Sequence, residues 1–327
     1  MRDAAMLAGL STWAALCIAL LVDHCWGEPP ARWHPVVWMG RYLGWAGARV
    51  APPMGRPYRR ARAFVAGMLA WCVGAGCVLA VALGVQGLLV QLPWWLSAPL
   101  LGLCLKPLLA WRMLHAEVLA VETALGVSLA AGRAQLARLV SRDVAVLSEA
   151  EVRESAIESL AENLNDSVVA PLFWFVLLGL PGAALYRFAN TADAMWGYLG
   201  ERGGRDWTWA GKWTARVDDV LSWLPARMTA AVLWMTAPRG RVARQGWRRL
   251  RREAQRTPSP NSGWPMAAMA LRLDVRLGKP GVYTLHAAGR SPVATDSGAA
   301  ARLGHRVVAT VALGALPMLL AWRHLAG

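Results

Sequence analysis

The chain contains a series of apolar stretches, each about as long as a helix that crosses a lipid bilayer. A hydrocarbon core of about 30 Å needs roughly 20 residues of α-helix, because each residue rises about 1.5 Å. Six stretches reach or approach this length: residues 4–22, 63–92, 94–110, 167–188, 220–237 and 306–322. Backbone groups in lipid must be paired within the protein, and a helix satisfies this segment by segment. The sequence therefore predicts an all-α, polytopic integral membrane protein with about 4–6 membrane segments and polar helical regions at the cytoplasmic face.

The charge of the chain is strongly positive and comes almost wholly from arginine. The formal net charge is +15, and the only lysines are Lys106, Lys212 and Lys279. Arginines gather in residues 56–62 and in the run from Arg239 to Arg256. The positive-inside rule explains both clusters and places them in the cytoplasm, whereas no fold for binding nucleic acid accompanies them. We therefore expect a multi-pass protein of the cell membrane, with any active site at the cytoplasmic face and no nucleic-acid partner. The arginines would also attract phosphorylated substrates.

The sequence predicts a single integral membrane domain over residues 1–327. Its segments are a first span (1–22), a helical hairpin (63–110), a polar helical region (111–165), a re-entrant hairpin in one of two interpretations (166–198), a weak span (220–237), a basic polar segment (238–305) and a last span (306–322). No small-residue cleavage site follows the first stretch, so we expect it to be retained as a helix. The five cysteines lie mostly in apolar stretches and are expected to pack there.

A regular pattern of acids occupies the segment before the fourth apolar stretch. Carboxylates recur at every fourth position, which gives one stripe on an α-helix: Glu154, Glu158, Glu162 and Asp166. Apolar residues with the same spacing fall on the opposite face: Val152, Ala156, Leu160 and Leu164. Ser148 and Glu151 fit a capping box that would begin this helix. The stripe is either a solvated face or, because a membrane-length segment follows at once, part of a site. In a site Glu158 would be the principal acid and Glu154 its solvated neighbour.

Residues 166–198 can enter the membrane in two ways. Val168 to Leu178 makes only about 16 Å of helix, roughly half a bilayer, and helix-stopping residues follow at 179–182. A re-entrant hairpin would bring Glu158 and Asp166 to the same membrane face as Asn190 and Asp193. A single tilted span over 167–188 would place the two polar groups on opposite faces. The sequence leaves both interpretations open.

Five groups of residues occur in an order that resembles one known family. They are Asp23…Gly27-Glu28-Pro29…His34-Pro35…Gly40; Glu158…Glu162-Asn163…Asp166; Asn190-Thr191-Ala192-Asp193-Ala194-Met195…Gly197-Tyr198; Arg216-Val217-Asp218-Asp219…Pro225-Ala226-Arg227; and Ser259-Pro260-Asn261…Gly263. This order resembles the cobalamin-biosynthesis CobD/CbiB family, adenosylcobinamide-phosphate synthase, over nearly the whole chain. One departure is Leu199, which stands where the family usually has a lysine.

The resemblance implies an integral membrane enzyme, an ATP-dependent amide ligase. It would join the propionate of adenosylcobyric acid to aminopropanol phosphate, giving adenosylcobinamide phosphate, with Mg²⁺ as cofactor and ATP as co-substrate. Implied partners are this corrinoid, aminopropanol phosphate, membrane lipid and other late enzymes of the cobalamin pathway. The implied catalytic residues are Glu158, Asp166, Asn190, Asp193 and Arg227. Those implied to bind the co-substrate are His34, Asn163, Arg216, Ser259 and Asn261, and the implied metal ligands are Asp193, Asp218 and Asp219.

The residue types also suit this chemistry by themselves. A carboxylate must be activated before an amine attacks it, and the sequence does not choose between an acyl phosphate and an acyl adenylate. Mg²⁺ prefers oxygen ligands and commonly takes one or two carboxylates together with phosphates. Cationic side chains stabilise charge on a transferred phosphoryl group, and Arg216 and Arg227 are the candidates. Because Arg227 lies inside an apolar stretch, we expect it to pair with one of the acids.

Each candidate also has a purely structural interpretation. Asn190 and Asp193 share a helix face and would bond to neighbouring helices. Asp218-Asp219 would cap the next helix, since carboxylates suit a helix N-terminus. Residues 259–263 have the composition of a turn. A lone histidine such as His34 is usually structural.

Other functional classes fit the sequence less well. Motifs typical of P-loops, dinucleotide-binding folds, zinc proteases and nucleophile elbows are absent. The alternative function is a membrane transporter for a charged solute, which broken helices and intramembrane polar residues would suit. The chain lacks repeat symmetry, however, and its acidic motifs lie at the ends of spans. A non-catalytic scaffold would leave the Asn-Asp and Asp-Asp motifs unexplained.

Overall fold

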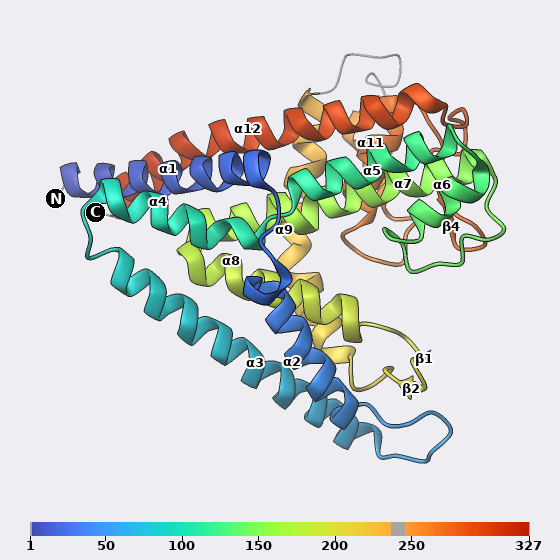
Figure 1. Ribbon diagram of the computed structural model, residues 1–327, viewed down its shortest axis with the longest axis horizontal. Helices are drawn as coiled ribbons and strands as arrows, with labels where there is room; N and C mark the ends of the chain where they lie inside the picture. The colour runs from blue at the N-terminus through green and yellow to red at the C-terminus, as the bar shows by residue number, and fades with distance from the viewer. Residues whose placement is uncertain (1, 237–245, 327) are drawn as a thin grey trace. The chain divides into compact units, whose positions relative to one another are not determined.

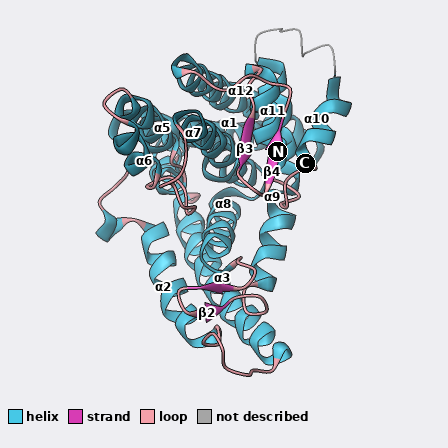
Figure 2. Ribbon diagram, turned by 90° about the vertical axis from the view of Figure 1, so that its right-hand side faces the viewer, coloured by secondary structure: helices cyan, strands magenta, loops and turns pink. Residues whose placement is uncertain are grey.

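The apolar stretches of the sequence form long helices in the computed structural model, which describes residues 2–236 and 246–326 (Figure 1). Within this part of the chain, strands occur only as two short antiparallel pairs (Figure 2). The prediction of an all-α fold is confirmed. Five described helical stretches are long and apolar enough to cross a membrane, as in a multi-pass membrane protein: Gly9–Trp26, Arg60–Leu89, Trp94–Leu125, Glu149–Trp196 and Ala294–Leu320.

Two of the predicted features fall partly or wholly outside these five helices. The weak span predicted at 220–237 lies in a helix that is not among the five. Arg239, Arg241 and Arg244, at the start of the predicted basic run, lie outside the described residues.

Contacts along the chain divide it into two compact units. Unit 1 contains Met1–Leu109, Ala170–Ser222 and Ala315–Gly327, and unit 2 contains Ala110–Val169 and Trp223–Gly314. The chain therefore passes between the units at several points, and neither unit is a continuous segment. A single membrane domain over the whole chain stays a prediction.

Unit 1 is a group of apolar helices with one small hairpin. Its elements are α1 (Arg2–Trp26), η1 (Ala31–Trp33), α2 (Pro35–Val50), α3 (Arg60–Leu89), α4 (Trp94–Leu105), η2 (Lys106–Leu108), α8 (Ala170–Trp196), β1 (Glu201–Arg202), β2 (Arg205–Asp206) and the first half of α9 (Lys212–Thr236). α1 packs along α4, and α3 packs along α8 (Figure 1). At the α1–α4 contact a Cβ on Gly102 would lie 2.7 Å from the carbonyl oxygen of Ala15. Small residues of this kind let membrane helices approach closely.

The helix α8 consists of two pieces that meet at Gly179. The backbone of Gly179 has φ 70° and ψ −157°, which is not helical. A Cβ on Gly182 would lie 2.5 Å from the carbonyl oxygen of Trp174, eight residues earlier. In an unbroken helix these residues would be about 12 Å apart along the axis. The chain therefore folds back at the predicted break, which favours the hairpin over one tilted span. Entry of this hairpin into a membrane from one side stays a prediction.

Unit 2 is built around α7 (Glu149–Leu164). The capping box predicted at its start is present, since Ser148 and Glu151 exchange hydrogen bonds. The other elements are α5 (Trp111–Leu125), α6 (Leu129–Leu136), a π-helical turn (Asn165–Val169), the rest of α9, α10 (Gly246–Ala254), α11 (Gly263–Leu273), β3 (Leu277–Lys279), β4 (Tyr283–Leu285) and most of α12 (Ala294–Ala326). Helices α5, α6 and α11 and strand β3 all pack against α7. The striped helix is therefore a central element of this unit.

We expect Gly179→Ala to destabilise the protein. A side chain at this position would have to adopt a left-handed conformation and would overlap the Gln86 amide, which accepts a hydrogen bond from the Leu180 N–H (2.7 Å). Such strain costs about 1–3 kcal/mol, so the melting temperature in detergent should fall by several degrees. The matched control is Gly84→Ala on α3, where nothing lies within 4 Å. An equal melting temperature for both variants would contradict the break at Gly179.

Candidate active site

Two acids of the α7 stripe are buried and paired with cations. Glu154 and Glu158 are only 4% and 1% exposed. Arg276 donates to Glu154 (3.0 Å), and Arg142 donates to Glu158 (2.7 Å). The expectation that Glu154 is a solvated neighbour is therefore wrong. The reason is that α11 and β3 pack against α7, and helical periodicity alone does not show what covers a face.

Glu158 has both carboxylate oxygens engaged. Arg142 binds Oε2, while the hydroxyl of Tyr283 on β4 donates to Oε1. Burial and the charge of Glu158 raise the pKa of Tyr283, so that it stays a neutral phenol that can donate this bond. A buried carboxylate costs several kcal/mol unless it is paired and hydrogen-bonded, and these two partners meet that need. The sequence did not predict Arg142, Arg276 and Tyr283, because none of them lies in a distinctive motif. Arg276 and Tyr283 also lie 122 and 125 residues from their partners.

The rest of the stripe is less constrained. Glu162 is half-buried, and no hydrogen bond or ion pair engages its carboxylate within the described residues. Asp166 lies in the π-helical turn and accepts a hydrogen bond from Asn165 (2.7 Å), which itself accepts one from Thr229 (3.0 Å). π-helical turns are frequent at functional sites. Asn163, predicted to bind the co-substrate, instead donates to the Ser159 carbonyl on its own helix (3.0 Å).

Arg227 is held by a turn and by two aromatic rings. It donates to the Asn261 side chain (3.1 Å) and to the carbonyls of Trp223 and Pro260. Its guanidinium lies 4.2 Å from the ring centre of Trp223 and 4.9 Å from that of Trp264. The expected partner among the acids is wrong, since within the described residues these bonds go to amide and carbonyl oxygens.

The turn at 259–263 is organised by Ser259. Its hydroxyl accepts hydrogen bonds from the backbone N–H groups of Asn261 and Ser262, both at 3.2 Å. The turn interpretation is therefore confirmed. The same turn presents Asn261 to Arg227, so two of the predicted co-substrate residues and one predicted catalytic residue lie together in unit 2.

A second charged cluster lies in unit 1 and centres on Lys106. The ammonium group is 3.2 Å from Asp23 and 3.0 Å from Glu28, and the side chains of Lys106 and Asp23 are 4% and 1% exposed. His34 Nδ1 accepts the Val36 N–H at the start of α2, so Nε2 carries the proton that is donated to Glu28 (2.9 Å). His34 is thus a structural capping residue here as well as part of the cluster. Sequence analysis missed Lys106, although a lysine at the end of an apolar run was a usable signal.

Asn190 and Asp193 both lie on the second piece of α8, one turn apart. The carboxylate of Asp193 lies against Gly197, and a Cβ at that position would overlap it. Glycine at position 197 therefore lets the carboxylate pack closely against the backbone. Glu158 and Asp166 belong to unit 2, whereas Asn190 and Asp193 belong to unit 1, so the shared face of all four stays a prediction.

The Asp218-Asp219 pair lies inside α9. The helix begins at Lys212, so the interpretation of these acids as a helix cap is wrong. Arg216 is 3.8 Å from Asp219 and mostly exposed. Burial raises the pKa of Asp219, and the charge of Arg216 opposes this only in part. Within the described residues no three His, Cys, Asp or Glu side chains gather in a ready-made metal site.

We expect Lys106→Met to destabilise the protein by about 3–5 kcal/mol, because it leaves the buried Asp23 and the half-buried Glu28 without this cation. The melting temperature should fall steeply, and the double variant Asp23→Asn/Lys106→Met should recover part of the loss. Lys212→Met is the control, since this lysine is exposed and lies over the Trp209 ring. Additive effects of the Asp23 and Lys106 changes would contradict a shared ion cluster.

The same cluster predicts a loss of stability in acid. Burial alone would raise the pKa of Glu28, but hydrogen bonds from His34 and Lys106 outweigh it and hold the pKa below its ordinary value of 4.5. A lowered pKa adds stability that is fully present above the unfolded pKa and is lost as the pH falls through the folded pKa. When the melting temperature is measured from about pH 7 to 3.5, it should decrease once the pH drops below about 4.5. The decrease should be smaller in Glu28→Gln. Glu201→Gln, at an exposed position, should keep the wild-type profile.

Comparison with known proteins identifies relatives over most of the chain. Residues 16–312 match the family described as CobD/Cbib protein. The chain is 38% identical over 285 residues to the probable cobalamin biosynthesis protein CobD of Methanothermobacter thermautotrophicus, covering 84% of this chain and 87% of the relative. It is 39% identical over 310 residues to the cobalamin biosynthesis protein CobD of Chromobacterium violaceum, covering 89% and 91%. A probable CobD of Methanothrix thermoacetophila is 34% identical over 326 residues, covering 96% and 99%. No solved structure matches the chain.

Proposed function

Because the chain belongs to the CobD/Cbib protein family, we propose that it is a cobalamin-biosynthesis enzyme of the cell membrane that joins a carboxylate to an amine. The proposed reaction links the propionate of adenosylcobyric acid to aminopropanol phosphate and yields adenosylcobinamide phosphate. ATP activates the carboxylate, as an acyl phosphate or an acyl adenylate, and the amine then displaces phosphate or AMP. The proposed active site faces the cytoplasm.

The observation that supports the proposal most is that the acids of the α7 stripe differ in their partners. Arg142 and Tyr283 engage both oxygens of Glu158, and Arg276 binds Glu154 through Oε1, so we assign both acids to positioning these groups. Glu162 lies one turn further along and makes no bond that a substrate would have to displace in the described structure. An attacking amine must lose a proton, and a half-buried carboxylate without a partner suits a general base. We therefore assign proton removal to Glu162, with Asp166 beside it and Glu158 in a positioning role.

The carboxylate of Asp193 and the oxygen donors near it in sequence suit a magnesium–nucleotide complex by their chemistry. Mg²⁺ takes oxygen ligands and is often held by one or two carboxylates together with the phosphates, so a cluster of three acids is not required. Asp193 and Asn190 offer a carboxylate and an amide one turn apart, and Asp218 and Asp219 offer two further carboxylates. When bound, Mg²⁺ neutralises charge on the phosphates of ATP. The contribution of the chain is to hold these oxygen donors on helices.

Arg227 is suited to binding a transferred phosphoryl group. The rings of Trp223 and Trp264 and the side chain of Asn261 fix the orientation of the guanidinium. A guanidinium that is already oriented loses little entropy when it binds a phosphate. We assign Arg227 to the stabilisation of negative charge that develops during carboxylate activation.

Purified protein in detergent should convert adenosylcobyric acid and aminopropanol phosphate to the amide when ATP and Mg²⁺ are present, as followed by mass. Glu162→Gln and Asp193→Asn should each lower kcat at least about 100-fold, in the range of a lost general base. Glu201→Gln is the control, because it removes an exposed carboxylate from the β1 strand. The Asp193→Asn variant should also need more Mg²⁺ for half-maximal rate.

The alternative transporter function gives a different result in the same preparation. Absence of product from well-folded protein, together with uptake of a charged solute into proteoliposomes, would contradict the amide ligase. Equal activity of Glu162→Gln and wild type would remove Glu162 from the mechanism while leaving the reaction itself intact.

A further inference from the structure

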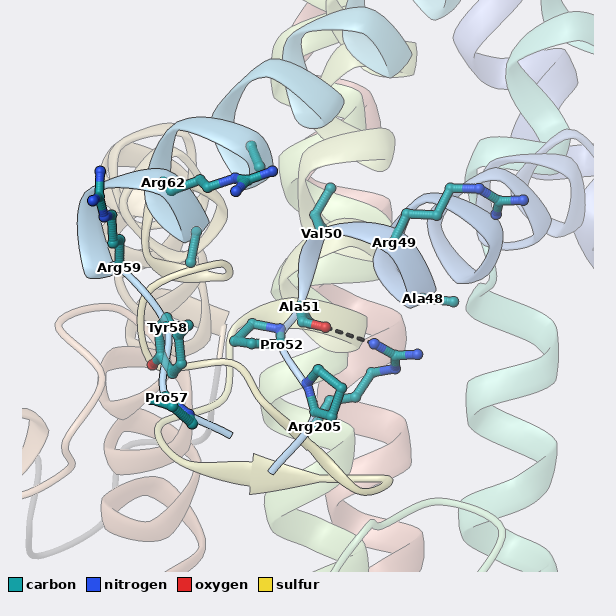
Figure 3. A pocket seen from close by; sticks show the side chains of 13 residues that line it. Ala48, Arg49, Val50, Ala51, Pro52, Pro57, Tyr58, Arg59, Arg62 and Arg205 are labelled. Atoms are coloured by element: carbon teal, nitrogen blue, oxygen red, sulfur yellow. Dashed lines mark hydrogen bonds between the residues drawn. The ribbon is translucent and has the colours of Figure 1, made fainter. Parts of the chain in front are cut away.

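A pocket of about 910 Å³ lies in unit 1, at the loop that connects α2 to α3 (Figure 3). Its walls come from the end of α2, the start of α3 and strand β2. Four of the residues that line it are arginines: Arg49, Arg59, Arg62 and Arg205. The sequence pattern predicted only the cluster at 56–62, since Arg205 joins it from a distant part of the chain.

Backbone hydrogen bonds build this pocket and fix its shape. The Met54 N–H donates to the Gly204 carbonyl (2.9 Å), and the Asp206 N–H donates to the Pro52 carbonyl (3.0 Å). Arg205 donates to the carbonyl of Ala51 (2.6 Å), as Figure 3 shows. Proline rings at 52, 53 and 57 stiffen the loop further. The α2–α3 loop and the β1–β2 hairpin are therefore held together and form one wall of the pocket.

The positive charge of the pocket is not neutralised by the protein. Among the described residues no carboxylate lies within 4 Å of the four guanidinium groups. The nearest acid in sequence, Asp206, does not line the pocket, and it accepts hydrogen bonds from Tyr58 (2.7 Å) and the Thr208 N–H (2.9 Å). Arg49 stacks on Trp45, with its guanidinium 4.1 Å from the ring centre. Like charges held together in a concave site favour a bound anion.

We propose that this pocket binds a phosphate group. Arginine binds phosphate oxygens through two parallel N–H bonds, which a pocket with several guanidinium groups can supply. The first turn of the 30-residue helix α3 begins in the wall at Arg59 and Arg60, without a side-chain cap, and its positive end adds to the attraction. The phosphate belongs to a phospholipid headgroup or to a soluble phosphorylated compound. α3 is a candidate membrane span that starts here, so the pocket would lie near the membrane surface. Lipid headgroups and soluble phosphorylated compounds could both reach it there.

The test compares Arg59→Gln/Arg62→Gln with a control that removes the same charge. The side chains of Arg59 and Arg62 are exposed and make no hydrogen bond to the described residues, so their replacement should leave folding unchanged. The control is Arg32→Gln/Arg41→Gln, two exposed arginines of unit 1 outside the pocket. One arm titrates inorganic pyrophosphate into protein in phosphatidylcholine nanodiscs by calorimetry. The other measures retained phosphatidylglycerol by native mass spectrometry after purification from mixed lipid.

A loss of affinity for pyrophosphate of at least tenfold in the pocket variant alone would assign the site to a soluble phosphorylated compound. A loss of retained phosphatidylglycerol in that variant alone would assign it to a lipid headgroup. Equal results for the pocket variant and the control in both arms would overturn the proposal. Neither arm needs turnover, so the outcome is independent of the proposed amide synthesis.

Discussion

A charge that is buried in an apolar helical protein must find an oppositely charged partner, and the packing of both units follows from this requirement. In unit 1 Lys106 is held between Asp23 and Glu28, so the end of α1, the following loop and the end of α4 are tied together. In unit 2 two acids of α7 bind arginines from other segments, Glu158 with Arg142 and Glu154 with Arg276. An arginine of α7, Arg153, in turn binds Glu122 of α5. Removing one member of such a pair leaves an uncompensated charge, which is far more costly than the pair itself.

These pairs also separate the carboxylates that stabilise the fold from those that can react. An acid whose two oxygens are occupied, such as Glu158, holds its neighbours in place. In our proposal, Glu162 of unit 2, whose carboxylate makes no hydrogen bond within the described residues, is the acid that accepts a bond from a substrate. In our proposal the stripe therefore contributes both to the fold and to the active site. This mixture explains why four like charges recur on a helix whose opposite face is completely buried.

The sequence predicted those features that depend on local chemistry. The capping box at Ser148, the membrane-length helices and the break at Gly179 all follow from nearby residues, and the structure contains each of them. The sequence could not predict which distant segment packs against a given face of a helix. Glu154 is buried because a β-hairpin more than a hundred residues later packs on α7. Arg227 binds Asn261 of a turn instead of an acid, and this turn lies 34 residues later in the chain. Asp218 and Asp219 lie inside α9 because that helix begins six residues earlier than the doublet, where no cap motif marks its start.

The proposed reaction requires that ATP activate a carboxylate before an amine attacks it. The most direct measurement uses adenosylcobyric acid labelled with ¹⁸O in the propionate carboxylate, in a complete reaction with ATP, Mg²⁺ and aminopropanol phosphate. Activation through an acyl phosphate or an acyl adenylate transfers one labelled oxygen to the phosphate or AMP that is released, and our account predicts this transfer in proportion to amide formed. Amide formation without any ¹⁸O in phosphate or AMP would contradict it.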